Sequence, residues 1–314
     1  MGRVAWRITR AADLVRDPPR ALISGSRAVI WLLVAPLVLG LAIFAVYPFI
    51  DVLALTFSKS SLGRPFQKWP VAANYLSLAR DETFRAALGR TMIFAIPVPL
   101  IEMTLGFSIA LLLHSSLRGA GWIRGVILLP LMTPPMMVAT AWKLILAPAG
   151  GLLDGVLLRT SLLGQPISFL GTMPWAFLSV AVADIWQWTP FVAILCYAAL
   201  QGLPEDIVEA ARVDGASSSN VLWHITLPML APTLLAILLL RVVIAFKLFD
   251  LVYGLTFGGP GFDTTVAAFQ VWRTALAQFD IGLASAQTII FAILVSLVTL
   301  PLTWLHRYSE AHAE

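Results

Sequence analysis

The residues that could do chemistry in this chain are a few ionisable and amide side chains inside long apolar stretches. Asp184, Gln187 and Trp188 stand at positions i, i+3 and i+4, so a helix would place them on one face. Another apolar stretch carries Lys247 and Asp250. Ionisable side chains are costly in lipid and are expected to face a polar cavity or a paired interior position. The chemistry they favour is binding of a polar solute.

Catalytic motifs are missing from the sequence. A Walker A loop ends in Gly-Lys-Ser/Thr, and none of the four lysines follows a glycine. The four histidines form no HExxH pair, and no G-x-S-x-G elbow occurs. A single cysteine, Cys196, excludes a disulfide within the chain. We therefore predict a chain that is not an enzyme, binds no metal, cofactor or nucleic acid, and depends on another protein for any ATP.

The composition indicates a membrane protein. Hydrophobic residues make up 59% of the chain and charged residues 12%, whereas soluble domains carry about a quarter charged residues. Several apolar segments approach the ~20 residues that cross a bilayer, and each must be helical because open strands leave backbone groups unpaired in lipid. The fold class we predict is an all-α integral membrane protein with six transmembrane helices, at Ala28–Phe49, Ala86–Leu113, Ile123–Leu146, Pro174–Leu200, Met229–Tyr253 and Gly282–Leu305.

Arginines near the N-terminus favour a cytoplasmic start under the positive-inside rule. They are Arg3, Arg7, Arg10, Arg16, Arg20 and Arg27. Six crossings put both termini on one side, which gives a cytoplasmic segment 1–27, a membrane domain 28–305 and a cytoplasmic tail 306–314. One observation weakens this orientation, because the first external loop is also basic, with Lys59, Arg64, Lys68, Arg80 and Arg85.

A hydrophilic loop, residues 204–228, separates the predicted fourth and fifth helices. Its sequence predicts a short helix Glu205–Val213, because Pro204 precedes it and acidic residues fill its first turn. Gly215 suits a left-handed cap, and the serines after it offer capping oxygens for a second short helix through Ile225. Pro228 is expected to begin the next membrane helix. The expected unit is a stiff helix–turn–helix on the cytoplasmic side.

The same loop contains E-A-A-x3-G-x9-I-x-L-P in register. This resembles the loop by which permease subunits of bacterial ATP-binding-cassette (ABC) importers dock onto their ATPase. The resemblance implies an ABC importer permease fold and assigns docking to Glu209, Ala210, Ala211, Asp214, Gly215, Ile225, Leu227 and Pro228. It also implies that ATP and Mg²⁺ are bound by the partner ATPase.

Further phrases are similar to the carbohydrate-uptake branch of these permeases, the maltose- and glycerol-phosphate-type systems. They are NYLSLARDETFRAAL, DIWQWTPF, AFKLFDLVYGLTFGGPG and GLASA. The large external insertion and extra N-terminal helices of the maltose-type subunit are missing. The resemblance therefore implies a sugar or sugar derivative as the transported solute.

Sugars are bound by carboxylates and amides at their hydroxyls and by aromatic rings at their apolar faces. The candidates for substrate contact are Trp142, Lys143, Asp184, Gln187, Trp188, Phe246, Asp250 and Tyr253, with Phe246, Asp250 and Tyr253 on one helical stripe. A structural alternative stays open, in which Lys247 pairs with Asp250 and the tryptophans belong to interfacial belts. Arg241 and Glu102 are expected to be structural charges or gate elements.

The resemblance implies an assembly in the bacterial inner membrane. The expected partners are a second, homologous permease in a heterodimer, two ATPase subunits, an external substrate-binding protein and the lipid bilayer. Import would proceed by alternating access. The alternatives are an ABC permease for a polyamine or phosphate ester, a self-sufficient secondary carrier and a membrane-embedded enzyme.

Overall fold

The structure is a computed structural model that describes residues 21–69, 72–114, 120–148, 150–161 and 164–311. Five of the six N-terminal arginines lie outside the described residues, as does the side chain of Arg27. The chain divides into two units, one ending at Leu55 and one beginning at Thr56, and each is described by itself.

The first unit is one long apolar helix in three parts. They are α2 (Ala21–Leu41), a π-helical turn η1 (Ala42–Val46) and α3 (Tyr47–Thr56). The span Val29–Thr56 has a mean hydropathy of 2.8 in its most apolar window, and none of that window is buried. An unburied apolar helix of this length suits lipid or a protein neighbour in the membrane. It extends further than the predicted Ala28–Phe49.

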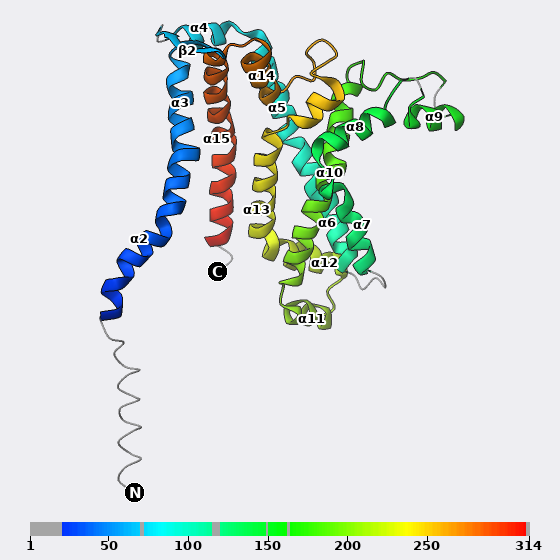
Figure 1. Cartoon of the computed structure of the whole chain (residues 1–314). Helices are drawn as coiled ribbons and strands as arrows, with labels where there is room; N and C mark the ends of the chain where they lie inside the picture. The colour runs from blue at the N-terminus through cyan, green and yellow to red at the C-terminus, as the bar shows by residue number, and fades with distance from the viewer. Residues whose placement is uncertain (1–20, 70–71, 115–119, 149, 162–163, 312–314) are drawn as a thin grey trace, which may run out of the picture. The chain divides into compact units, whose positions relative to one another are not determined.

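The second unit holds the remaining elements, most of them helical (Figure 1). In chain order they are β1 (Lys59–Ser61), β2 (Arg64–Lys68), α4 (Ala73–Arg80), α5 (Glu82–Ala95), α6 (Pro97–His114), α7 (Ala120–Met132), α8 (Pro135–Ile145), α9 (Leu152–Arg159), α10 (Trp175–Gln201), α11 (Glu205–Val213), α12 (Ser218–Val221), η2 (Leu222–Thr226), α13 (Leu227–Phe246), η3 (Val252–Thr256), α14 (Ala267–Trp272), η4 (Arg273–Ala277) and α15 (Ile281–Ala311). Within the described residues, the all-α expectation is broken by the antiparallel pair β1–β2 and by an isolated bridge between Ser61 and Asp280.

Five helices in the described residues are long and apolar enough to cross a membrane. They are Val29–Thr56, Glu82–His114, Trp175–Gln201, Ser218–Phe246 and Ile281–Ala311. The pair α7 and α8 makes a sixth span if both helices count as one. The predicted class, a six-span helical membrane protein, is confirmed on this count.

The predicted third helix is not continuous. Its two halves, α7 and α8, are bent by 93° at a break between Met132 and Pro135. Pro134 and Pro135 cause the break, because neither has an N–H to donate and a proline disfavours helical geometry in the residue before it. The predicted segment Ile123–Leu146 is therefore helical on both sides of a break and is not one continuous helix.

The predicted fifth helix also ends early. Helix α13 stops at Phe246, and Lys247–Phe249 form a turn before helical structure resumes at Asp250. The C-terminal cap is made by the N–H of Lys247, which donates to the carbonyls of Ala245 and Ile244. Since the helix is interrupted, the expected single stripe Phe246–Asp250–Tyr253 does not exist.

Packing in the second unit joins α6 to α10 and α13 to α15. Gly106 allows the first of these contacts, because a Cβ there would lie 2.7 Å from Val192 Cγ1 and 2.9 Å from the backbone nitrogen of Ala193. The second contact is filled by apolar side chains that include Val242 and Phe246. These helix pairs form the frame that holds the interior polar residues.

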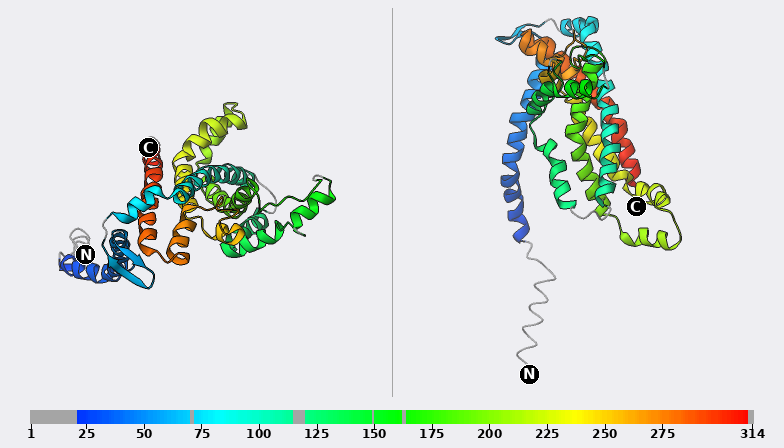
Figure 2. Two further views of the ribbon diagram at one scale, coloured as in Figure 1. Left: turned by 90° about the horizontal axis from the view of Figure 1, so that it is seen from above. Right: turned by 90° about the vertical axis from the view of Figure 1, so that its right-hand side faces the viewer.

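Two ends of the second unit are distinct in Figures 1 and 2. Helices α4 and α14 lie at one end, and α11 lies at the other. Helix α15 runs between them and finishes at the α11 end. The hydrophilic loop and the last described turn of the chain are therefore on the same side of the unit.

Candidate functional site

Three charged side chains from three helices meet in the interior of the second unit. Arg241 of α13 is 1% exposed, and its Nε and Nη2 lie 2.5 Å and 2.8 Å from the two carboxylate oxygens of Glu102 of α6. Its Nη2 also contacts Asp184 Oδ2 of α10. The guanidinium fork suits such paired contacts, which a lysine could not make. One guanidinium therefore ties together three membrane helices.

Two neighbours complete this charge cluster, Glu102–Asp184–Arg241. The ring of Trp188 lies 5.0 Å from Arg241 Cζ, within the range of a cation–π contact. Gln187 donates from Nε2 to the carbonyl of Thr133 at 3.1 Å, at the break between α7 and α8. That contact satisfies a carbonyl in the non-helical break and ties α10 to α7 and α8.

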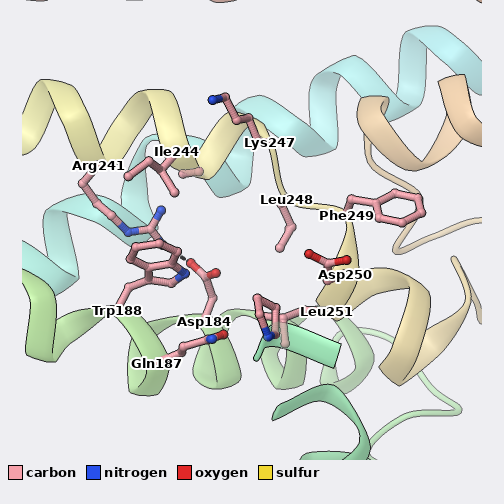
Figure 3. A pocket seen from close by; sticks show the side chains of 12 residues that line it. Asp184, Gln187, Trp188, Arg241, Ile244, Lys247, Leu248, Phe249, Asp250 and Leu251 are labelled. Atoms are coloured by element: carbon pink, nitrogen blue, oxygen red, sulfur yellow. Dashed lines mark hydrogen bonds and ion pairs between the residues drawn. The ribbon is translucent and has the colours of Figure 1, made fainter. Parts of the chain in front are cut away.

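A cavity of about 170 Å³ opens beside the cluster (Figure 3). Its polar walls are Asp184, Gln187, Arg241, Lys247 and Asp250, which come from α10 and from α13 with the turn after it. Its apolar walls are Pro135, Trp188, Ile244, Ala245, Leu248, Phe249 and Leu251. Ligand pockets are typically about 300–1,000 Å³, so this cavity is smaller than a typical ligand pocket.

Four of the predicted substrate residues meet around this cavity, and four do not. Asp184, Gln187, Trp188 and Asp250 line it. The others lie elsewhere: Phe246 is buried against Phe291, Tyr253 joins aromatic rings that include Phe249 and Trp272, Trp142 packs against Trp186, and Lys143 is exposed in the last turn of α8.

Arg241 belongs both to the charge cluster and to the cavity wall, a combination that the sequence does not predict. Arg241 and Glu102 were expected to be structural or gate charges, and the structure pairs them with each other and with Asp184. No ion pair joins Lys247 to Asp250 among the described residues, so the alternative that they pair is wrong. The signal that could have found the cavity is its two helix breaks, at Pro134–Pro135 and after Phe246.

The hydrophilic loop forms a second polar region. Helix α11 spans Glu205–Val213, as predicted, with Glu205 and Asp206 in its first turn. Gly215 has φ +84°, and the N–H of Ala216 donates to the carbonyl of Ala211 at 2.9 Å. This left-handed reversal is the geometry that glycine adopts at little cost.

The helix after the turn differs from the prediction. Ser217 Oγ accepts from the N–H of Asn220 at 3.3 Å and caps α12, as expected. The helix does not end at Ile225, because α12 continues through η2 into α13, so Ser218–Phe246 is one helix. The π-helical turn ends with the N–H of Leu227 donating to Leu222, immediately before Pro228. The expected separate second helix is therefore wrong.

The predicted docking residues lie mostly on the surface of the loop. Glu209, Ala210, Asp214, Gly215 and Pro228 are exposed, whereas Ala211, Ile225 and Leu227 are half-buried. Glu209 faces a cavity of about 900 Å³ between α11 and the ends of α6 and α10, together with Glu205 and Arg212. Apolar side chains are also exposed here, with Ile207 at 42%, Val213 at 87% and Trp223 at 64%.

Comparison with known proteins decides the family. Residues 102–313 match the sequence profile of the binding-protein-dependent transport system inner membrane component. The chain belongs to this family. The match begins at Glu102, within α6, and continues past the end of α15. It therefore includes both the charge cluster and the hydrophilic loop 204–228, called the α11 loop below, of this binding-protein-dependent permease.

Curated relatives are permease proteins of named transport systems. The permease is 34% identical over 274 residues to the trehalose/maltose transport system permease protein of Thermococcus litoralis. The alignment covers 86% of this chain and 90% of that protein. It is 31% identical over 266 residues to the trehalose transport system permease protein of Mycobacterium tuberculosis, with 84% of each chain covered. An sn-glycerol-3-phosphate transport system permease protein of Agrobacterium fabrum is 28% identical over 270 residues, 86% of this chain and 91% of that protein.

Solved structures share the fold. A chain of a bacterial ABC transporter involved in the import of the acidic polysaccharide alginate has a TM-score of 0.81 and 21% identity, covering 92% of this permease and 99% of that chain. A chain of the MetNI methionine ABC transporter has a TM-score of 0.54 and 15% identity, covering 74% and 98%. The ABC importer permease fold predicted from the sequence is thus confirmed.

Proposed function

We propose that this permease carries a sugar or sugar derivative into the bacterial cytoplasm, driven by ATP that a separate ATPase hydrolyses. The trehalose, maltose and lactose systems among its relatives support the sugar class. The observation that carries the proposal is the continuous helix Ser218–Phe246, which begins at the α11 loop and reaches the cavity beside Arg241.

The α11 loop is the proposed contact with the ATPase. Ile207 and Val213 expose apolar surface on a short helix whose C-terminal end is closed by the hydrogen bond from Ala216 N–H to the carbonyl of Ala211. Exposed apolar side chains gathered in one place are typical of protein contacts. Glu209 adds a carboxylate that could pair with a basic group of the partner.

The continuous helix gives this contact a mechanical consequence. At about 1.5 Å per residue, its 29 residues reach about 43 Å, the thickness of a bilayer with its headgroups. A displacement of the loop would therefore move Arg241 and the cavity wall with it. ATP binding and hydrolysis by the partner would open the cavity alternately to each side.

The remaining partners follow from the same proposal. A second permease subunit would complete the substrate site, since the cavity in this chain is too small by itself. Two ATPase subunits would dock at the α11 end, and a substrate-binding protein would dock at the end formed by α4 and α14. The α11 end and both termini would be cytoplasmic.

The test is uptake by the assembled importer in proteoliposomes. Labelled trehalose and maltose are supplied outside with the binding protein, and ATP is trapped inside. The proposal expects uptake with ATP and none with a non-hydrolysable analogue. Uptake of spermidine but of no sugar would instead support the polyamine alternative, and ATP-independent uptake would support a secondary carrier.

A further inference from the structure

The charged side chains that line the cavity beside Arg241 determine whether it attracts or repels a charged solute. We propose that it takes uncharged, hydroxyl-rich solutes and excludes anionic ones, and that Asp250 sets this preference. This inference rests on the proposed function, because it concerns the site through which the sugar would pass.

The positive charge of Arg241 is already offset within the protein. Its Nε and Nη2 face Glu102, and Nη2 also faces Asp184, so two carboxyl groups stand against one guanidinium. The cluster is negative if both carboxyls are ionised and neutral if one holds a proton. Trp188 lies 5.0 Å from Arg241 Cζ and covers one face of the guanidinium. In neither state does Arg241 present a net positive charge to an incoming anion.

The other charged walls of the cavity are Lys247 and Asp250. In Figure 3 the amine of Lys247 points away from the carboxylates of Asp184 and Asp250. Lys247 is exposed, whereas Asp250 is half-buried and has no hydrogen bond or ion pair with another described residue. Water screens an exposed ammonium more than a half-buried carboxylate. The local potential is therefore dominated by Asp250.

The uncharged polar atoms favour a hydroxyl donor. Gln187 is 2% exposed and lines the cavity, and its Nε2 donates a hydrogen bond to the carbonyl of Thr133. Its Oε1 has no hydrogen-bond partner, although buried polar atoms are nearly always paired. An unpaired amide oxygen and the carboxylate of Asp250 both accept hydrogen bonds. A sugar hydroxyl can donate to them, whereas a fully ionised phosphate or carboxylate group has no proton to donate.

Thiol modification measures this potential directly. The only cysteine of the sequence, Cys196, is buried, and the experiment first replaces it by alanine. Ile244→Cys then puts one thiol on the cavity wall in the complete importer. The probes are a cationic trimethylammonium and an anionic sulfonate methanethiosulfonate reagent, with modification followed by the mass of this chain. Phe249→Cys gives a second position on the same wall.

For each reagent, the rate at the introduced cysteine is divided by its rate with a free thiol in solution. We expect this relative rate to be at least about fivefold higher for the cationic reagent than for the anionic one. In water, a unit negative charge at about 8 Å raises the local concentration of a monovalent cation a little over twofold and lowers that of a monovalent anion by the same factor, so the ratio of the two changes about fivefold. Asp250→Asn should therefore lower the ratio about fivefold, whereas Glu82→Gln, which removes a carboxylate 89% exposed on α5, should leave it unchanged. A faster anionic reagent, an unchanged ratio in Asp250→Asn, or no reaction at either position would overturn the inference.

Uptake by the same complex separates this inference from the proposed function. Trehalose carries no charge and sn-glycerol 3-phosphate is an anion. Uptake of trehalose but not of the anion supports the inference, whereas ATP-driven uptake of the anion overturns it and leaves the importer function intact. If trehalose, maltose and the anion are all left outside in the presence of ATP, the proposed function fails, and the thiol ratio still reports the cavity potential.

Discussion

Arg241 and Glu102 are 139 residues apart in the sequence, and their charged groups meet at 2.5 Å and 2.8 Å inside the second unit. With Asp184 they join α6, α10 and α13 at the level of the cavity. A buried charge is tolerated when it is paired, and removing one partner leaves the others uncompensated. The cluster therefore fixes the helices that line the cavity.

Replacing Arg241 by methionine should destabilise the permease by about 3–5 kcal/mol, because two buried carboxyl groups lose their cation. Thermal unfolding in detergent measures the effect. The matched control replaces all three, as Arg241→Met with Glu102→Gln and Asp184→Asn, and should recover much of the loss. If Arg241→Met alone unfolded like the wild type, the cluster would have no structural role.

Gly106→Ala should loosen the packing of α6 against α10. The added Cβ would lie 2.7 Å from Val192 Cγ1 and 2.9 Å from the backbone nitrogen of Ala193, and the backbone atom can move only with its helix. Overpacking of this kind costs about 1–3 kcal/mol.

Gly89→Ala is the control for this change. It lies in helix α5 with no atom within 4 Å of its added Cβ, so we expect equal or greater stability. Thermal unfolding of both variants tests the contact, and equal stability of the two would contradict it.

Val213→Asp should separate the permease from its ATPase without unfolding it. Val213 is 87% exposed, so a charge there has little effect on the fold, whereas it would be buried in the proposed contact. The measurement is co-purification of the ATPase with the tagged permease. Leu276→Asp, at an exposed position on η4, should keep the ATPase bound. Equal recovery from both variants would remove Val213 from the docking surface.

The local signals of the α11 loop were strong enough to be read from the sequence. Acidic residues, Gly215 and Ser217 act within a few residues of themselves, and the structure has the helix, the reversal and the cap where they were expected. The continuation into α13 was missed because Pro228 looks like a helix start. A π-helical turn before it, at Leu222–Thr226, accommodates the proline instead.

The cavity was less predictable because it depends on contacts between distant segments. Asp184, Gln187 and Trp188 were found together since they share one helix face. The pairing of Arg241 with Glu102, and the turn that carries Asp250 to the cavity, follow from tertiary packing and a helix break. Periodicity assumes a continuous helix, which is why Phe246 and Tyr253 were wrongly grouped with Asp250.

The central claim is that the α11 loop transmits the work of the ATPase to the sugar pathway, and Gly215→Pro tests it most directly. Proline fixes φ near −65°, whereas Gly215 has φ +84° and donates its N–H to Arg212, so the reversal cannot form. For importers that still contain the ATPase, sugar-stimulated ATP hydrolysis and trehalose uptake are measured in the same proteoliposomes. The account predicts that both fall at least about tenfold, and uptake at the wild-type rate would contradict it.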